Sequence, residues 1–303
     1  MALKVRRRSP EPENATRIGS VRNFLSSLDQ FERDTDHVYF YRGHSDFTFD
    51  LLPSIYRNRG WTQSEDVLFK ELILRCPNDF GSERSTFQTL VRMQHYALPT
   101  RLLDITSNPL IALYFASEID KPLNESGEVL VFRVPKREIK YFDSDTVSVL
   151  SNISKRPANF DAGSPTDDLD TLNRREDIKL LLHEIRSEKP YFEAKIQPAH
   201  LHSVLCVKPK MDNARIIRQD GAFFLFGVAG SKLKPASLPS HYAVADRLPR
   251  LIIKWDEKRT IRDQLESFGI TKGTIFPEIE RVAEYIRSIH AIAEPETLYL
   301  RAK

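Results

Sequence analysis

Cysteine is scarce in this sequence of 303 residues, which has only Cys76 and Cys206. Two cysteines supply neither a disulfide framework nor a cysteine-based metal site. Cys76 follows an apolar, helix-like run and Cys206 lies in the strand-like stretch SVLCV, so we expect both to be buried structural thiols. This usage predicts a reduced, cytoplasmic protein.

The sequence also lacks an apolar run long enough to cross a bilayer, so no membrane association is expected. Its N-terminal stretch MALKVRRRSPEPENATR is basic and then proline-rich, without the apolar segment of a signal peptide. We expect residues 1–17 to form a flexible basic arm, with nucleic-acid binding by this arm as the alternative. Since no clear linker follows, residues 18–303 are expected to form a single domain.

A strong excess of charge of one sign is missing too. Lys and Arg together number 45 and Asp and Glu 42, which gives a formal net charge of +3. This balance argues against a protein that binds nucleic acid over its whole surface. The short basic clusters RNR, KPK and NRR keep a nucleic-acid-binding protein or a nuclease open as an alternative.

Common cofactor and catalytic signatures are absent, because the sequence has no GxGxxG, no P-loop and no GxSxG. His200 and His202 lie close together, but no Cys, Asp or Glu stands beside them at ligand spacing, so no metal is expected. What is present is a hydrophobic share of 41% with 10% aromatic residues, which is enough for a sizeable core.

Helical patterns concentrate at the two chain ends and strand patterns in the middle, which favours an α+β fold around a mixed or antiparallel central sheet. Helices are predicted over residues 20–31, 64–76, 83–98, 108–119, 176–185, 258–270 and 276–290. Strands are predicted over residues 37–44, 100–105, 127–135, 200–209, 214–219, 221–228 and 248–255. The Pro-, Gly- and Asp-rich stretch 154–175 is expected to be a mobile loop.

The stretch FYRGH ends one predicted strand with Arg42 and Gly43. An arginine at a strand end can present its planar guanidinium to a phosphate or carboxylate. The glycine allows a backbone or a ligand to approach closely. The alternative is an internal ion pair followed by an ordinary turn.

Polar residues crowd the stretch QHYALPTRLLDITSNPLIALYFAS, residues 94–117, where a buried strand meets an apolar helix. One of Thr106, Ser107 and Asn108 is expected to cap this helix. A helix cap accounts for only one of these polar residues. The remaining polar side chains predict an anion site at the helix N-terminus. A buried polar network is the alternative.

Arg101 and Asp104 stand three apart on the predicted strand, so they point to opposite faces and do not form one surface salt bridge. We expect Asp104 to face inward and to orient Arg42 or His95, raising the pKa of the imidazole in the second case. Arg101 is expected to reach the other face and brace a loop. Alternatively, Asp104 only caps the helix that begins at Asn108.

The stretch RIIRQDGAFFLFG places Arg215, Gln219 and Gly221 around the start of an apolar strand. Gln219 either reaches a ligand or closes a hairpin with the turn dipeptide Asp220-Gly221.

Four stretches together resemble the FRG domain, which is named for its Phe/Tyr-Arg-Gly motif. They are YRGH, QHYALPTRLLDITSNPLIALYFA, RIIRQDGAFFLFG and GITKGTIFPEIERVAEYI, and their order and spacing match from Val38 to Ile286. This sequence has Tyr41 in place of the motif's Phe and Ala97 where Gly is usual.

A second, more distant resemblance is to the ADP-ribosyltransferase fold. Arg42-Gly43, LLDITSNPLIALYFA and RQDGAFF are similar to its arginine strand, its Ser/Thr strand with the following helix, and its late catalytic strand. The resemblance implies a split sheet that holds NAD, as a substrate, between its halves. The residues it implies for NAD binding are Arg42, Gly43, Thr100, Arg101, Thr106, Ser107 and Arg215.

One position departs from that pattern, because Gly221 falls where the catalytic Glu is expected. In the family this Glu binds a ribose hydroxyl and stabilises oxocarbenium-like charge as nicotinamide leaves. Either an acidic residue elsewhere takes this role, or His95 and Asp104 do different work, or the domain binds without catalysing. The acidic alternatives are Asp220, Glu184 and Glu188. The candidate catalytic residues are His95, Asp104, Gln219 and Glu188.

The resemblances imply an intracellular NAD-binding enzyme, in a toxin or defence setting, that modifies a macromolecule or hydrolyses NAD. The acceptor would be a protein or a nucleic acid. A non-catalytic ligand-binding module stays open beside the nucleic-acid alternative. The sequence fixes neither the acceptor nor the oligomeric state.

Overall fold

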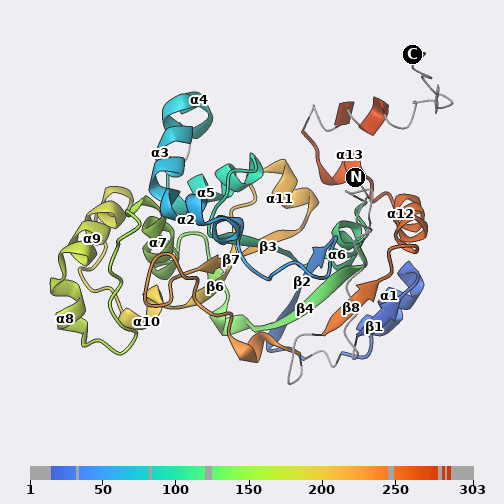
Figure 1. Ribbon diagram of the computed structural model, residues 1–303, viewed down its shortest axis with the longest axis horizontal. Coiled ribbons are helices and arrows are strands. Elements are labelled where there is room, and N and C mark those ends of the chain that lie inside the picture. Colours follow the sequence, from blue (N-terminus) through green and yellow to red (C-terminus); the bar gives the residue numbers. More distant parts are fainter. Residues whose placement is uncertain are drawn as a thin grey trace, which may run out of the picture.

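The computed structural model describes residues 15–31, 34–81, 84–119, 125–244, 249–278, 282–283 and 285–287. Eight strands in this part of the chain form one mixed sheet, so the expected α+β fold is confirmed (Figure 1). The strands are β1 (Thr16–Ile18), β2 (His37–His44), β3 (Leu102–Thr106), β4 (Gly127–Pro135), β5 (Lys140–Tyr141), β6 (Val204–Lys208), β7 (Gly221–Phe226) and β8 (Arg250–Ile253). Their order is β1-β8-β4-β2-β3-β7-β6-β5.

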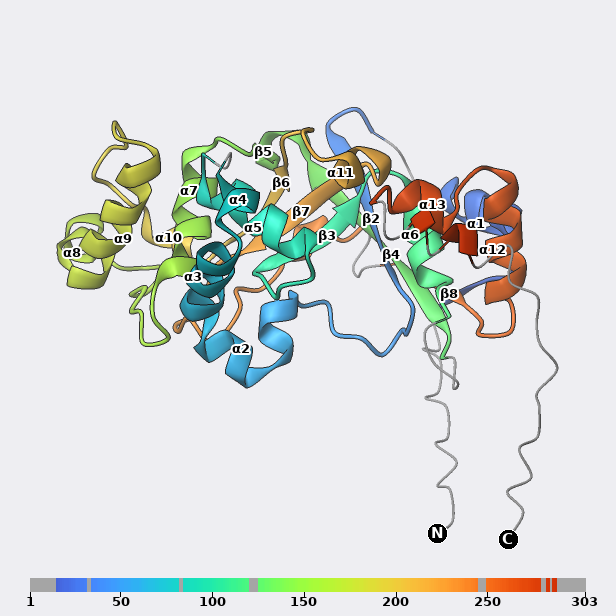
Figure 2. The ribbon, with the colours of Figure 1, turned by 90° about the horizontal axis from the view of Figure 1, so that it is seen from above.

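Helices occur at both ends of the described chain and also between the strands. They are α1 (Val21–Leu28), α2 (Arg59–Gln63), α3 (Glu65–Arg75), α4 (Pro77–Phe80), α5 (Thr86–His95), α6 (Pro109–Ala116), α7 (Asp145–Asn152), α8 (Leu169–Arg174), α9 (Glu176–Glu188), α10 (Pro198–Leu201), α11 (Ala214–Arg218), α12 (Lys258–Ser267) and α13 (Lys272–Ile275). Short 3-10 turns cover Ser54–Arg57, Lys136–Glu138, Ile153–Lys155 and Ser240–Tyr242. In two views α8 and α9 lie at one end of the molecule and α1 and α12 at the other (Figures 1 and 2).

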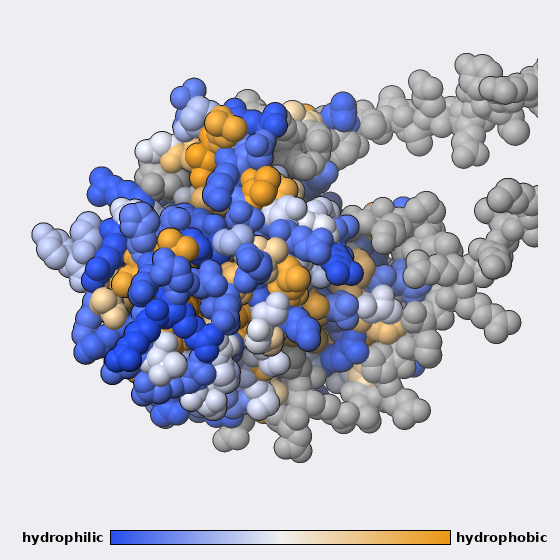
Figure 3. All heavy atoms as spheres, turned by 60° about the vertical axis from the view of Figure 1, so that its left-hand side comes forward, coloured by the Kyte–Doolittle hydropathy of each residue, from blue (hydrophilic) through white to orange (hydrophobic). Residues whose placement is uncertain are grey.

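The surface agrees with a protein whose apolar residues are mostly inside. Seen with the α8 and α9 end turned forward, it is largely hydrophilic with scattered hydrophobic patches (Figure 3). Of the helices described here, none combines the length and the apolar character that a membrane span requires.

The sheet divides between β2 and β3. β2 runs antiparallel to β4 over eight residue pairs, from His37↔Pro135 to His44↔Glu128. Its register with β3 on the other side is a single pair, Tyr41↔Thr106. The two halves, β1-β8-β4-β2 and β3-β7-β6-β5, therefore diverge away from this point.

The core follows the same division. On one face of the sheet, the β2 half packs against α1, α6 and α12, and the β3 half packs against α5, α7 and α9. These are two separate hydrophobic clusters. On the opposite face a single cluster, which includes Phe40, Phe132 and Phe224, runs across both halves. The first face therefore has a gap between its clusters, directly above the β2–β3 junction.

Local sequence signals account for many element boundaries. Ser20 accepts from the main-chain N of Asn23 and caps α1. Cys206 is buried, as predicted, whereas Cys76 is only partly buried, and both are free thiols. The first strand begins at Thr16, so Thr16 and Arg17 belong to the sheet and not to the arm expected over residues 1–17. Residues 1–14 of that arm lie outside the described residues.

Two predicted elements are wrong. Residues 214–219 were expected as a strand, but they form α11, whose N-terminus is capped by Asn213. The stretch 154–175 was expected as a mobile loop, but it contains α8, and Arg175 ties it together through Asp161 and Asp167. Of the predicted helix over residues 276–290, residues 276–278 are not helical, whereas the described residues 282–283 and 285–287 are helical, as predicted. The other residues of this stretch lie outside the described part of the chain.

Candidate functional site

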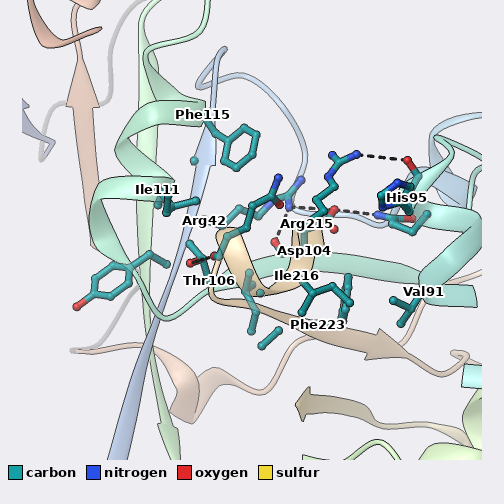
Figure 4. A pocket seen from close by; sticks show the side chains of 18 of the residues that line it. Arg42, Val91, His95, Asp104, Thr106, Ile111, Phe115, Arg215, Ile216 and Phe223 are labelled. Atoms are coloured by element: carbon teal, nitrogen blue, oxygen red, sulfur yellow. Dashed lines mark hydrogen bonds and ion pairs between the residues drawn. The ribbon is translucent and has the colours of Figure 1, made fainter. Parts of the chain in front are cut away.

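A cavity of about 210 Å³ lies where the two halves of the sheet diverge (Figure 4). It opens in the gap between the two hydrophobic clusters, and β2, β3, β7, α5, α6 and α11 all contribute to it. The predicted site residues that line it are Arg42, Gly43, His95, Asp104, Thr106, Arg215 and Gln219. Its apolar wall includes Val91, Ile111, Phe115, Ile216 and Phe223.

Arg42 enters the cavity from β2 and is held from two sides. Its Nη1 donates to the main-chain O of Asp104 at 2.5 Å, and its Nε donates to Nε2 of His44 at 2.9 Å. Behind it, Nδ1 of His44 lies 3.0 Å from Oε1 of Glu128, whose Oε2 accepts from Nε of Arg250 at 2.5 Å. This relay of side chains fixes the Arg42 guanidinium before any ligand arrives.

The relay also sets the protonation of His44. An arginine can only donate, so Nε2 of His44 is the acceptor and its ring proton lies on Nδ1, facing Glu128. Burial lowers the pKa of His44, although Glu128 opposes this. Burial also lowers the pKa of Arg42, to about 10, with Asp104 raising it and Arg57 lowering it. At neutral pH the imidazole is therefore neutral and the guanidinium is charged.

Gly43 is needed because α6 packs directly on β2. A Cβ at this position would stand 2.0 Å from the main-chain O of Ala112 and 2.7 Å from the main-chain N of Ala116. Gly127 on the neighbouring β4 meets the same helix, since its Cβ would stand 1.9 Å from the main-chain O of Ala116. These glycines let the helix wall of the cavity lie against the sheet.

Asp104 reaches the cavity from β3. Its Oδ2 accepts from Nε2 of Gln94 at 2.8 Å, and Oε1 of Gln94 accepts from Oγ1 of Thr100 at 2.6 Å. The carboxylate lies 4.0 Å from Nη1 of Arg42, and 56% of the Asp104 side chain is exposed. Asp104 thus faces the open cavity, and the prediction that it faces inward is wrong. Thr100, expected to bind the ligand, lies behind Gln94 and orients it.

The helix cap belongs to Asn108. Its side chain accepts from the main-chain N of Leu110 at 3.0 Å, which confirms one of the predicted caps. The alternative in which Asp104 caps this helix is therefore wrong.

Thr106 joins α6 to the end of α11. Its hydroxyl donates to the main-chain O of Gln219 at 2.6 Å and accepts from the main-chain N of Asn108 at 3.0 Å. Ser107 lies just outside the cavity, where its main-chain N donates to the main-chain O of Asp220 at 3.1 Å. Both hydroxyl residues of the predicted motif therefore support the cavity floor.

Arg101 and Glu188 lie away from the cavity. Arg101 is completely buried on the opposite face of β3, as its spacing from Asp104 predicted, and its Nε donates to Oε1 of Glu65 at 2.9 Å. It braces the interior, so its predicted contact with the ligand is not supported. Glu188 accepts from the main-chain N of Thr86 at 2.6 Å, at the far end of α5, roughly 13 Å along the helix from His95.

The remaining acidic alternatives also lie outside the cavity lining. Glu184 pairs with Lys155 at 3.7 Å. Asp220 adopts a left-handed φ of 46° and its carboxylate accepts from Nδ2 of Asn108 at 3.1 Å. Because Asp220 follows a helix, the Asp220-Gly221 pair is a helix-to-strand turn, and the hairpin alternative is wrong.

Protein groups lie next to both ring nitrogens of His95. Oδ1 of Asn213 accepts from the main-chain N of Arg215, so Nδ2 of Asn213 faces Nδ1 of His95, at 3.3 Å. Nε2 then carries the proton and lies 3.0 Å from Glu278. The predicted pairing of His95 with Asp104 is wrong. Burial lowers the pKa of His95, against the raising effect of Glu278, so the predicted rise is wrong too.

The charges of the cavity favour an anionic ligand. Arg42 and Arg215 supply two guanidinium groups, and Asp104 is the carboxylate among the lining residues. Within the described ranges, no group of three or more His, Cys, Asp or Glu side chains is arranged to hold a metal ion.

Several important residues escaped the sequence analysis. Gln94 and His44 stand inside the quoted motifs, next to residues that were singled out. Glu128 and Arg250 come from distant strands, and only the pairing of β2 with β4 and of β4 with β8 brings them behind Arg42. No spacing in one sequence predicts that relay.

Comparison with known proteins gives one family match. The model of the FRG domain matches residues 37–125, a stretch that begins with β2 and includes β3 and α6. No curated protein matches the chain, and no solved structure does. Much of the cavity wall, including Arg215, Gln219 and Phe223, comes from outside the matched residues.

Proposed function

We propose that this chain, which carries an FRG domain over residues 37–125, binds NAD in the cavity between the two halves of its sheet. We further propose that it breaks the bond between nicotinamide and ribose, as ADP-ribosyltransferases and NAD glycohydrolases do. The observation that carries the proposal is Arg42, a charged side chain that is fixed by His44 and exposes only 14% of its surface, inside a small cavity.

Arg42 suits a phosphate of the dinucleotide. A guanidinium presents its donors as a planar fork that matches phosphate oxygens, and its position here is set before binding. The cavity of about 210 Å³ is smaller than the roughly 300–1,000 Å³ of pockets that enclose drug-sized ligands. One half of NAD would therefore be enclosed, with the apolar wall of Ile111 and Phe115 against its ring, and the rest would lie outside.

Asp104 is the carboxylate we assign to the chemistry. As the glycosidic bond breaks, its electron pair leaves with nicotinamide and positive charge develops on the ribose. A carboxylate near that ribose stabilises the charge, as in glycoside hydrolysis. Water or a nucleophile of a protein or nucleic acid acceptor would then add to the ribose carbon. Gln94 holds Asp104 by a hydrogen bond of 2.8 Å, which favours a fixed geometry for this step.

Release of nicotinamide from NAD, followed by chromatography, tests this assignment. Asp104→Asn keeps the shape and the bond to Gln94 but removes the charge, so turnover should fall roughly 100-fold or more, with the fold unchanged. Asp220→Asn is the matched control, because Asp220 is also exposed but does not line the cavity. An Asp104→Asn protein as active as wild type would remove Asp104 from the chemistry.

A second candidate is a module that binds NAD without turnover. It is favoured by Gly221, which stands where ADP-ribosyltransferases, which the sequence distantly resembles, carry their catalytic Glu, and which offers no side chain to the cavity. In that case the wild-type protein binds NAD in the same cavity and releases no nicotinamide.

A further inference from the structure

The end of α13 and the residues that follow it contact three residues that line the cavity. The main-chain O of Ile275 accepts from Nε2 of Gln219 at 3.3 Å. The ring of Phe276 lies 4.8 Å below the guanidinium carbon of Arg215, and its centroid is 6.0 Å from that of Phe115. Gln219, Arg215 and Phe115 all line the cavity. Gln219 thus contacts Ile275, and the other two contact Phe276.

Two protein groups contact the Arg215 guanidinium. One face of the guanidinium rests on the Phe276 ring, which is a favourable cation–π geometry. One edge is used as well, since Nη1 of Arg215 donates to the main-chain O of His95 at 3.3 Å. A guanidinium has five N–H donors in a rigid fork, so these contacts leave donors for a ligand while they remove freedom of rotation.

Glu278 lies next to the same arrangement. Its Oε1 is 3.0 Å from Nε2 of His95, and the main-chain O of His95 accepts from Arg215. The direct contact of this segment with Arg215 is the one made by Phe276.

Arg42 and Arg215 approach the cavity from different halves of the sheet. Arg42 comes from β2 and Arg215 from α11, which follows β6 and precedes β7. Figure 4 shows both side chains rising on the same side of the strands. Two fixed guanidinium groups lining a cavity of about 210 Å³ suit two neighbouring phosphates better than one, because each phosphate can take its own fork.

We propose that Arg42 and Arg215 clamp a diphosphate, one phosphate on each guanidinium, and that Phe276 is the residue that positions Arg215 for the second phosphate. This inference rests on the proposed function and makes it more specific, because it selects ligands with two linked phosphates over those with one. It also makes the C-terminal segment, which lies outside the FRG match, part of the binding site.

Titration calorimetry with ADP and AMP on the full chain tests the clamp. Wild type should bind ADP roughly ten times more tightly than AMP or better, because the second phosphate adds charge-assisted bonds. In Phe276→Ala this preference should shrink to roughly threefold or less, while AMP, held by Arg42, keeps its wild-type affinity within about twofold. Arg215→Gln should lose the preference in the same way, and Phe276→Ala combined with Arg215→Gln should add little further.

Two matched variants control for loss of an aromatic ring. Phe276→Tyr keeps the ring under Arg215 and should keep the ADP preference. Phe268→Ala removes a ring that is 64% exposed from the same part of the chain and should change neither affinity. Unchanged AMP binding shows in each variant that the cavity is folded.

The outcomes separate this inference from the proposed function. If wild type binds NAD but takes ADP and AMP equally well, or if both Phe276→Ala and Arg215→Gln keep the preference, the clamp is wrong and the NAD proposal stands. If folded wild type binds none of NAD, ADP and AMP, the proposed function fails and the clamp with it.

Discussion

Arg42 depends on residues that never touch the ligand. Its Nε donates to His44, which in turn faces Glu128, so the YRGH motif joins the binding group and its support in three consecutive residues. The intervening Gly43 lets α6 pack against the strand. Each residue of the Arg-Gly-His string thus has its own physical role, in binding, close packing and orientation.

The buried imidazole of His44 makes stability depend on pH. Its folded-state pKa is lowered from the ordinary value of 6.5, so the unfolded chain takes up this proton first as the pH falls. Stability from this group is present above pH 6.5 and is lost below it, by up to about 1.4 kcal/mol per pH unit for one suppressed proton. In urea titrations, His44→Gln should show a shallower decline between pH 6.5 and 5.

Glutamine is a suitable replacement because its amide can accept from Arg42 and donate to Glu128 at once. The lowered pKa of His95 affects the pH dependence of stability equally in wild type and His44→Gln. The difference between the slopes of stability against pH in the two proteins therefore reports on His44 alone. Identical slopes for wild type and His44→Gln would contradict the assigned neutral, buried imidazole.

The sequence predicts individual site residues only where their neighbours along the chain indicate a site. Arg42, Asp104 and Thr106 were expected in the site because they crowd the ends of strands, and the cavity contains all three. Arg101 and Glu188 were misplaced because sequence cannot tell a buried internal ion pair or a helix-end contact from a ligand contact. Glu278 was missed because its partner, His95, is more than a hundred residues away and nothing in the spacing links them.

At the level of elements, the end of α5 carries much of the site. It closes with a Schellman motif, in which the main-chain N of Leu98 donates to the O of Met93 and that of Ala97 to the O of Gln94, both at 3.0 Å. Ala97 takes the left-handed position, with a φ of 60°. This explains why Gly is usual here in the family that the sequence resembles.

Ala97→Gly should therefore be neutral or stabilising by up to about 1 kcal/mol, because it relieves the left-handed strain of a Cβ against a modest entropy cost. Ala199→Gly, at an exposed position inside α10, is the contrast and should destabilise by roughly 0.5–1 kcal/mol. Chemical denaturation of both variants measures this. A loss of stability in Ala97→Gly as large as in Ala199→Gly would contradict the assigned backbone strain.

Element types were predictable where periodicity was long or a cap was clear, as for β2, β4, α6 and α12. The prediction failed for α11. The β-branched pair Ile216-Ile217 is typical of a strand, but the cap made by Asn213 stabilises a helix here. The divergence of β2 from β3 could not be read from sequence, since it depends on how both halves pack against their own helices.

At the scale of the whole molecule, a buried ion cluster joins distant segments beneath the site. Glu65 at the start of α3 lies 2.5 Å from Nη2 of Arg101 and 3.2 Å from Nζ of Lys232. All three side chains are buried. The charges compensate one another only as a set, so this cluster holds α3, the start of β3 and the loop after β7 in one arrangement.

Glu65→Gln should destabilise the protein by about 3–5 kcal/mol, because it leaves two cations without their counter-charge in the interior. Glu71→Gln is the matched control, since its partner Arg75 is exposed and such surface pairs contribute roughly 0–1 kcal/mol. Urea unfolding of the two variants compares them directly. A change below about 1 kcal/mol in Glu65→Gln would mean that the cluster is not charged as assigned.

The central claim is that NAD binds on Arg42 in the cavity between the sheet halves, and calorimetric titration of NAD tests it most directly. Arg42→Lys keeps the charge but loses the planar fork and the bond from Nε to His44. Wild type should bind NAD saturably, Arg42→Lys should weaken binding roughly tenfold or more, and Arg59→Lys, at an exposed position on α2, should leave it unchanged. Folded wild-type protein that does not bind NAD, or an Arg42→Lys variant that binds it as tightly, would contradict the account.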